Sequence, residues 1–339
     1  MYEQLGDSED SGLCNQPFFL DRRDFLAALA ATTAAGLLGL TGCSSSPRQA
    51  DDSSPFGTPA LRPGRQQRYA KGSTSSSTAL QHQVLRLLAI MTAKGMIGPD
   101  ERSSWSVYDI NAGKPLVAIN RDIPRQTASM VKPLVAQAFF FNVKNSGGRI
   151  QFTDDIRSTM ASSIRHSSNS ATNRLIDLVG NDPHDVEIVL KRNAPSIFKQ
   201  TRIVEKIPPS GRTFRNVASA GDYTRFLISL WHDRLPYSGE LKRLMNLPNR
   251  DRITHGVDSM PSSVRVYDKT GSTSQLCGDM GIIDAPSRNG RRVPYVFVGI
   301  IERPTSASNY GAWISRRGNA IRAVSNLVYL DMKQRYQLV

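Results

Sequence analysis

The order of hydrophobic patterns along this chain of 339 residues predicts an α+β fold in which a helical block interrupts a single β-sheet. Residues 79–93 carry apolar side chains at the three- and four-residue spacing of a helix with one buried face. Residues 105–110 and 115–120 are two short apolar runs, and the Asn-Ala-Gly-Lys segment between them is typical of a hairpin turn. The folded part therefore opens with a helix and two paired strands.

The patterns from about residue 129 to 261 are mainly helical, and three strand-like segments follow: residues 264–270, 277–284 and 293–302. The last of these is nearly all apolar, which predicts a central strand, and a helix over residues 311–329 closes the chain. Because strands lie on both sides of the helical block, one sheet must bring them together. The two terminal helices can then cover one sheet face and the helical block the other, with a ligand groove between sheet and block.

Residues 1–43 have the organisation of an export signal. Arg22 and Arg23 precede an uncharged apolar stretch of about 15 residues, shorter than the roughly 20 residues of a membrane-spanning helix. The paired arginines resemble a twin-arginine signal, and Leu40 to Cys43 resembles a bacterial lipobox, whose cysteine carries the lipid. We expect an exported protein, lipid-anchored through Cys43 in the bacterial cell envelope. The alternative is a weak membrane anchor that is never cleaved.

Residues 44–78 are rich in Ser, Pro, Gly and Arg and lack a hydrophobic period, which predicts a flexible linker before a folded domain over residues 79–339. Cleavage at the lipobox would remove Cys14, and lipidation would occupy Cys43. Cys277 would then stand alone, so the mature chain could form no intramolecular disulfide.

The formal net charge of +14 predicts a surface that favours anionic neighbours, although a solvated basic face explains most of these residues equally well. The chain has no nucleic-acid-binding motif, no Cys/His spacing typical of a metal site and no glycine-rich phosphate loop. We expect no metal, no organic cofactor and no nucleic acid as ligands, and a monomeric protein.

Ser129 and Lys132 form an SxxK pair at the start of a predicted helix. Residues three apart share a helical face, so the two side chains can meet. A lysine whose pKa is lowered by burial or by positive charge can take the serine proton and make the hydroxyl a nucleophile. On its own, such a pair is more often two surface residues of a helix.

Two further elements follow in the sequence. Ser167, Ser168 and Asn169 precede a helical run, and Lys269 to Ser272 read Lys-Thr-Gly-Ser at the end of a strand-like segment. Taken singly, the first could be a helix cap and the second a turn. The three elements in this order, on a helix start, a loop of the helical block and a strand, are a much stronger signal for one catalytic site.

Together these motifs resemble those of the serine β-lactamase and penicillin-binding protein superfamily, and of its class A β-lactamase-like domain in particular. The resemblance covers about residues 80–336 and implies an antiparallel sheet with helices, plus an all-helical lobe. It implies that Ser129 is the acylated nucleophile and Lys132 its proton partner. Ser167 would pass a proton to the leaving nitrogen, and Asn169 would hold the substrate amide.

The resemblance also assigns roles on the strand. Lys269 would supply positive charge, Thr270 would hydrogen-bond the substrate carboxylate, and Gly271 would complete the substrate-binding stretch. The backbone N–H groups of Ser129 and Ser272 would form the oxyanion hole. These roles are coherent, because an anionic carboxylate needs a cationic, hydroxyl-lined strand end.

The chain departs from the class A pattern at several places. Ser168 stands where aspartate is usual, which predicts changed local packing with retained chemistry. Pro133 follows the lysine directly, as is familiar among transpeptidase members of the superfamily. The short spacing between Ser129 and Ser167 predicts a trimmed loop and an open site.

The most serious departure concerns deacylation, for which class A enzymes use a glutamate on a loop after the second motif to activate water. Residues 201–216 hold no clear counterpart. Matching the Ile207-Pro208 step places Gln200 near the expected position. Glu205 is the one acidic residue of this loop, and it is either a displaced general base or a salt-bridged structural residue.

Three functions fit these residues. The first is a serine hydrolase that opens β-lactams, with slow turnover limited by deacylation. The second is a DD-peptidase acting on peptidoglycan stem peptides, which an open site and a basic surface also suit. The third is a tethered, non-catalytic binder of penicillin or cell-wall fragments. All three need the motif at Ser129, so the sequence discriminates among them only weakly.

Overall fold

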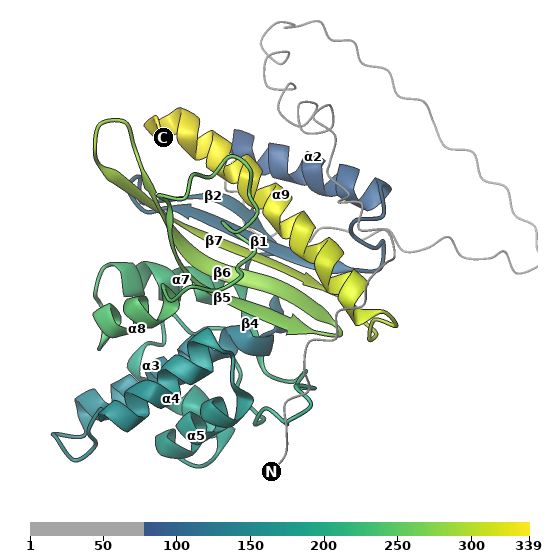
Figure 1. The fold of residues 1–339 in the computed structure, drawn as a ribbon. Helices are drawn as coiled ribbons and strands as arrows, with labels where there is room; N and C mark the ends of the chain where they lie inside the picture. The colour runs from purple at the N-terminus through teal and green to yellow at the C-terminus, as the bar shows by residue number, and fades with distance from the viewer. Residues whose placement is uncertain (1–77) are drawn as a thin grey trace, which may run out of the picture.

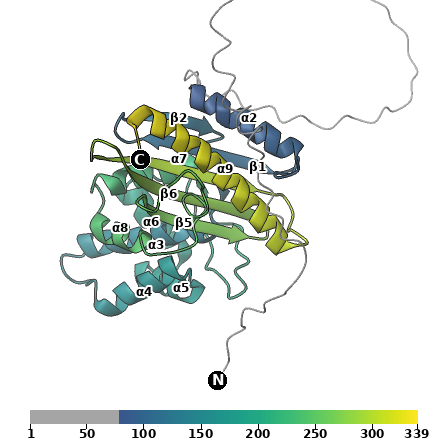
Figure 2. The same cartoon turned by 45° about the horizontal axis from the view of Figure 1, so that its top comes forward.

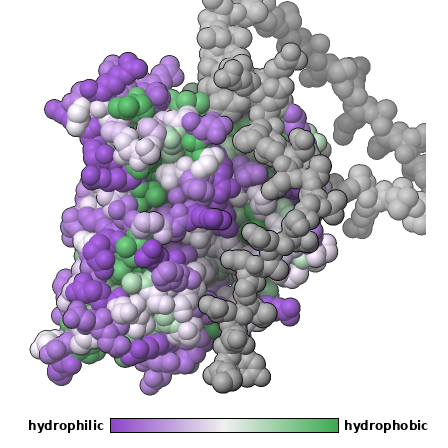
Figure 3. Space-filling model, viewed as in Figure 1, coloured by the Kyte–Doolittle hydropathy of each residue, from purple (hydrophilic) through white to green (hydrophobic). Residues whose placement is uncertain are grey.

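The computed structural model describes residues 78–339, and the signal, linker and lipidation predictions made for residues 1–77, with Cys43, lie outside them. The described residues form a five-stranded sheet with helices on both faces and a helical lobe beside it (Figure 1), which confirms the predicted α+β fold. In the same view the surface is largely hydrophilic, and its apolar patches are small and separate (Figure 3). Within residues 78–339, no helix has the length and apolar character needed to cross a membrane.

The sheet is antiparallel throughout, in the order β2-β1-β7-β6-β5. Its strands are β1 (Arg102–Asp109), β2 (Lys114–Ile119), β5 (Arg265–Thr273), β6 (Leu276–Pro286) and β7 (Arg292–Glu302). As predicted, strands from both ends of the domain pair, and the apolar β7 is the middle strand. β5 lies at the edge, so one side of its backbone is open to a ligand.

Two helices cover the outer face of the sheet, as predicted: α2 (Ala79–Ala93) and α9 (Tyr310–Tyr336) lie across it in both ribbon views (Figures 1 and 2). The Thr78 side chain caps α2 by accepting from the Gln81 N–H. A buried ion pair holds α9, because Arg317 contacts the Glu101 carboxylate at 2.7 Å. The helix α9 continues beyond the predicted end at residue 329.

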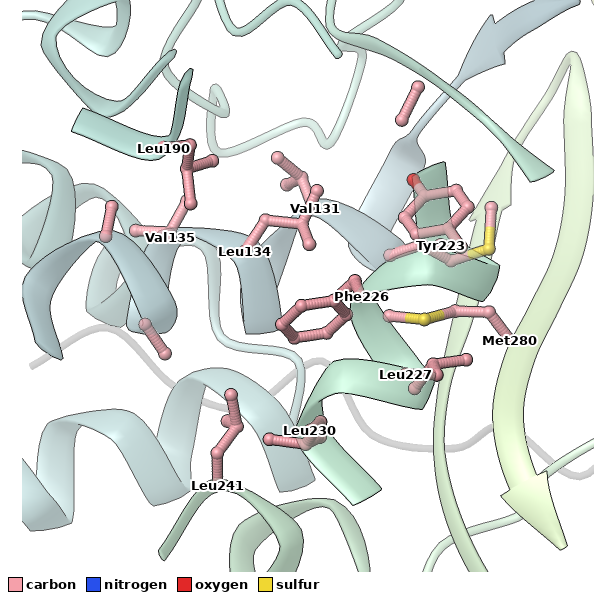
Figure 4. Close-up of a cluster of buried hydrophobic side chains, with 14 of the residues drawn as sticks. Val131, Leu134, Val135, Leu190, Tyr223, Phe226, Leu227, Leu230, Leu241 and Met280 are labelled. Atoms are coloured by element: carbon pink, nitrogen blue, oxygen red, sulfur yellow. The ribbon is translucent and has the colours of Figure 1, made fainter. Parts of the chain in front are cut away.

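The lobe packs against the other face. Its helices are α3 (Lys132–Asn145), α4 (Asp154–Arg165), α5 (Asn169–Val179), α6 (Pro183–Asn193), α7 (Ala220–Trp231) and α8 (Ser238–Met245). The helix α7 joins lobe to sheet, since Thr224 Oγ1 donates to Ser106 Oγ of β1 at 2.8 Å. In the core between them, Val131 and Leu134 lie near Phe226 of α7 and Met280 of β6 (Figure 4).

The mainly helical block predicted over about residues 129–261 also contains the short strand β4 (Val217–Ser219), which pairs with β3 (Pro124–Gln126) in a two-stranded sheet. Strands of three residues are too short to show a period in sequence. The Glu302 carboxylate ties β3 to the main sheet, because it accepts from Arg125 at 3.2 Å and from the Gln126 N–H at 3.1 Å. This contact fixes the start of the next element, the 3₁₀ helix η1 (Ala128–Val131).

Candidate active site

Ser129 lies in η1, which packs against the edge strand β5. Its neighbour Met130 sits beside Gly271 and Gly278, which face each other on β5 and β6. A Cβ at Gly278 would lie 2.7 Å from Met130 Cε, and one at Gly271 would lie 3.1 Å from the Thr127 carbonyl oxygen. The two glycines therefore let η1 approach the sheet closely, which brings Ser129 beside the Lys-Thr-Gly strand.

Lys132 is fully buried in the first turn of α3. Its amine donates to the Ser167 carbonyl oxygen, to Ser167 Oγ at 3.1 Å and to Asn169 Oδ1 at 3.0 Å. Burial and the nearby positive charge of Lys269 lower the pKa of Lys132 to about 7. The structure thus brings the three sequence motifs together around an amine that titrates near neutral pH.

Among the described residues, no hydrogen bond joins the Ser129 hydroxyl to Lys132, because the three protons of the charged amine go to Ser167 and Asn169. The neutral amine has two protons and a lone pair. Loss of one proton therefore frees Lys132 to accept the Ser129 proton, which is the step that makes a serine nucleophilic.

Residues 166–168 connect α4 to α5, whose first residue is Asn169. Ser167 adopts a left-handed backbone (φ 53°), and so does Ala128 (φ 44°), which precedes the nucleophile. Such conformations cost free energy in residues other than glycine and cluster at functional sites. Ser168 caps α5, because its side chain accepts from the Ala171 N–H at 3.2 Å. Serine caps a helix as well as aspartate does, so Ser168 is physically adequate where aspartate is usual.

Lys269, Thr270 and Ser272 lie along β5. Burial lowers the pKa of Lys269, whose amine donates to the Thr270 carbonyl oxygen at 3.1 Å. Arg252, from the loop before β5, donates to Ser272 Oγ at 2.6 Å and to the Gly271 carbonyl oxygen at 3.3 Å. The position of Arg252 could not be predicted from the sequence, because a lone arginine in an irregular loop carries no motif. Its guanidinium adds a second positive charge beside the strand end predicted to bind a carboxylate.

Two buried carboxyl groups lie on the sheet close to this strand end. Asp268 of β5 and Asp279 of β6 share a sheet face, since their paired positions differ by two residues. Asp268 Oδ1 accepts from Asn249, and Asp279 Oδ2 accepts from the Arg252 N–H; the other oxygen of each has no partner among the described residues. Burial raises the pKa of both groups; the charges of Asp279 and Asp251 raise that of Asp268 further, and the charge of Asp251 raises that of Asp279 further.

Glu205 is fully engaged within its own loop. Its Oε1 accepts from Thr213 Oγ1 and from the Phe214 and Arg215 N–H groups at 2.6–2.9 Å, and its Oε2 pairs with Arg215 Nε at 2.7 Å. Although burial alone would raise it, these hydrogen bonds lower the pKa of Glu205 to about 2. A carboxylate with so low a pKa is a weak base, and its lone pairs already accept hydrogen bonds. Glu205 therefore fits a structural role in the loop better than the role of a general base. Gln200 is exposed, and its N–H donates to Asp222 at 2.8 Å.

Two other features of the described residues concern ligand binding. No three His, Cys, Asp or Glu side chains within residues 78–339 are grouped so that they could hold a metal ion. A cavity of about 380 Å³ is lined by residues between Asn249 and Val264, and the motif residues do not line it.

A serine, a buried amine that titrates near pH 7 and a cationic strand edge together have the composition of a serine acyl-transfer site. The sequence model of the Beta-lactamase enzyme family (Beta-lactamase2) matches residues 148–329, more than half of the chain. The chain therefore belongs to the Beta-lactamase enzyme family, which confirms the resemblance drawn from the motifs.

Solved structures with a similar fold include a mutant of PBP-A described as an acyl-enzyme complex with penicillin G. It is 20% identical, with a TM-score of 0.59 over 75% of this chain and 96% of that one. A β-lactamase from Desulfarculus baarsii is 19% identical, with a TM-score of 0.56 over 72% of this chain and 94% of that one. A β-lactamase from Xanthomonas campestris pv. campestris is 18% identical, with a TM-score of 0.58 over 74% of this chain and 97% of that one. These likenesses confirm the fold. A search of curated proteins finds no match.

Acylation of Ser129 should depend on pH with a midpoint near 7. We expect neutral Lys132 to act as the base, so the second-order rate constant should rise as pH rises through about 7 and fall roughly tenfold for each pH unit below it. Stopped-flow kinetics with a chromogenic β-lactam measure this, and Lys132→Ala should lose most of the rate together with the acidic limb. An acidic limb near the pKa of a free carboxyl group, about 4, would point to a different base.

Asp279→Asn should stabilise the protein increasingly as pH rises. A carboxyl whose pKa is raised in the folded state contributes stability that is present below its unfolded pKa and lost as pH rises through the folded pKa. Asparagine mimics the protonated form, so we expect a gain of about 4 kcal/mol at pH 8 that vanishes near pH 4. Urea unfolding across this range tests it. Asp284→Asn on the same strand breaks the pair with Arg292 and should destabilise instead.

Glu205→Gln should lower stability and leave deacylation unchanged within about threefold, whereas loss of a general base would slow it by a hundredfold or more. The glutamine cannot pair with Arg215, which costs about 1–3 kcal/mol. Because the pKa of Glu205 is lowered from 4.5 to about 2, its contribution is present above pH 4.5 and lost as pH falls toward 2. Unfolding curves and adduct lifetimes by mass separate the two roles. A tenfold longer adduct lifetime would restore Glu205 as the base.

Proposed function

We propose that this protein is a class A-like serine hydrolase whose Ser129 is acylated by β-lactams and deacylated slowly. The observation that carries the proposal is the buried Lys132 amine, with its pKa near 7, held by Ser167 and Asn169 beside the charge of Lys269. A buried, nearly neutral lysine next to a serine is costly for stability and is useful for removing the serine proton.

The proposed reaction follows from these groups. Ser129 Oγ attacks the β-lactam carbonyl carbon, and its proton passes to neutral Lys132. The N–H groups of Ser129 and Ser272 bind the oxygen that becomes negative. The bond between carbonyl carbon and nitrogen then breaks, and the nitrogen takes a proton from Lys132 through Ser167 Oγ, which lies 3.1 Å from that amine.

The anionic carboxylate of the substrate would bind at the free edge of β5. Lys269 and Arg252 supply positive charge there, and the Thr270 hydroxyl supplies a donor. One of the solved structures of this fold is described as an acyl-enzyme with penicillin G, which supports acylation by β-lactams here.

A DD-peptidase acting on peptidoglycan stem peptides is the second candidate. The engagement of Glu205 favours it, because a peptidase that transfers or slowly hydrolyses its acyl group needs no strong base on this loop. If the bound group were never hydrolysed, the protein would be a non-catalytic binder that keeps a penicillin or wall fragment. In each case we propose an exported monomer, lipid-anchored on Cys43, whose basic surface faces an anionic envelope.

Wild-type protein should show a burst of ring opening equal to the enzyme concentration, followed by a slow steady state, with the adduct on Ser129. Ser129→Ala should give neither burst nor adduct. Intact mass and peptide mapping after exposure to penicillin measure both, and release of D-alanine from a stem peptide tests the second candidate in parallel. An adduct on another serine, or fast turnover without a burst, would refute the proposal.

A further inference from the structure

We infer that Asp279 is a positioning residue for the oxyanion hole, because it anchors Arg252, whose guanidinium holds the peptide unit that carries the Ser272 N–H. This inference rests on the proposed function, in which that N–H binds the oxygen of the attacked carbonyl group. Asp279 is fully buried, so it acts through hydrogen bonds along the sheet and does not touch the substrate.

The first of these hydrogen bonds ties the loop before β5 to the sheet. Asp279 Oδ2, on β6, accepts from the Arg252 backbone N–H at 2.7 Å. The preceding residue, Asp251, is also buried, and its Oδ1 accepts from the Ile253 and His255 N–H groups at 2.8 Å and 3.0 Å. The backbone on both sides of the Arg252 Cα is therefore held by carboxyl groups, and Asp279 supplies a contact that fixes it against β6.

The helix α9 closes over the same loop. Arg322 of α9 donates to the Asp251 carbonyl oxygen at 3.2 Å and to the His255 carbonyl oxygen at 2.7 Å. A Cβ at Gly318 would lie 3.5 Å from Arg252 Nε, so the helix backbone passes close to the guanidinium. Arg252 is therefore packed between α9 and the sheet, which limits the positions that its side chain can take.

The guanidinium of Arg252 spans the ends of β5 and β6. Its Nη1 donates to the carbonyl oxygens of Gly278 at 2.9 Å and of Gly271 at 3.3 Å, and its Nη2 donates to Ser272 Oγ at 2.6 Å. Gly271 and Gly278 are paired across the two strands, and Met130 packs against both. A rigid, planar group that donates to three acceptors fixes their relative positions. Arg252 thus holds the part of β5 that receives the nucleophile segment η1.

The carbonyl of Gly271 and the N–H of Ser272 belong to one peptide unit. No cis peptide bond occurs among the described residues, and in a planar trans unit the C=O and N–H bonds point in opposite directions. Arg252 also donates to Gly278 of β6, so it holds the Gly271 carbonyl from the β6 side, and the Ser272 N–H points toward the free edge of β5. An oxyanion donor is effective when its direction is fixed before charge develops. The contact from Arg252 supplies that fixed direction.

Asp279 is a costly residue if its role is only structural. Its Oδ1 has no hydrogen-bond partner among the described residues, and burial raises the pKa of the carboxyl group to about 7. A buried polar atom without a partner destabilises a fold. The contact with Arg252 therefore accounts for an acidic residue that lowers stability at neutral pH.

Asp279→Ala removes the acceptor, whereas Asp279→Asn keeps an oxygen that can accept from the Arg252 N–H. Acylation of Ser129 over a range of penicillin concentrations separates the dissociation constant of the first complex from the acylation rate constant. We expect Asp279→Ala to lower the rate constant about 10–100-fold and to change the dissociation constant less than about threefold, because the charges of Lys269 and Arg252 remain. Asp279→Asn should acylate within about threefold of wild type.

The infrared carbonyl band of the acyl-enzyme reports the oxyanion hole directly. A hydrogen bond to the carbonyl oxygen weakens the C=O bond and lowers its stretching frequency, so the band should move to higher frequency in Asp279→Ala. Asp284→Ala is the matched control, since it removes a buried carboxylate of the same strand that pairs with Arg292 at 2.6 Å. This control should lose stability and keep the wild-type rate constant and band.

Arg252→Lys provides a second test if Asp279→Ala does not fold. Lysine keeps the charge but lacks the planar fork, so the rate constant should fall and the band should shift in the same direction. A wild-type rate constant and band in Asp279→Ala, or in Arg252→Lys, would overturn the inference. Asp279→Asn as slow as Asp279→Ala would overturn it as well. A wild-type protein that never forms an adduct would contradict the proposed function itself.

Discussion

The buried amine of Lys132 is the constraint on which the rest of the site depends. Moving its pKa from 10.5 to about 7 corresponds to roughly 5 kcal/mol in favour of the neutral form. Burial and the charge of Lys269 cause this shift, while acceptor atoms of Ser167 and Asn169 hold the amine in place. Residues of all three motifs therefore contact the Lys132 amine or act on its charge. This explains why elements so far apart in sequence converge on one point.

The site also requires a fixed contact between sheet and lobe, because Ser129 belongs to the lobe and the cationic strand belongs to the sheet. An apolar contact, Met130 beside Gly271 and Gly278, and a buried ion pair, Arg125 with Glu302, hold the two parts together. A buried ion pair is weak evidence for added stability, but it constrains geometry strongly. Catalysis demands that constraint, since small displacements of reacting groups reduce rates by large factors.

The sequence predicted the sheet, its central strand and the meeting of the three motifs, because periodicity and short motifs are local signals. It did not predict β3 and β4, which are too short to show a period, or the role of Arg252, which depends on a loop folding back on β5. The position of the loop of residues 201–216 could not be predicted from the sequence. Its position on α5 is set by Asn173, a tertiary contact that matching the Ile207-Pro208 step could not reveal.

Acylation and deacylation place unequal demands on this architecture. In the proposed acylation the nucleophile is Ser129, which the chain itself holds in place, so the entropic cost of alignment is met during folding. In deacylation the nucleophile is a free water molecule, which must be held and deprotonated by the loop that covers the acyl group. The sheet edge and the lysine can therefore support acylation whatever the loop contains. The loop is then the feature by which a hydrolase, a peptidase and a covalent binder can differ while sharing one fold.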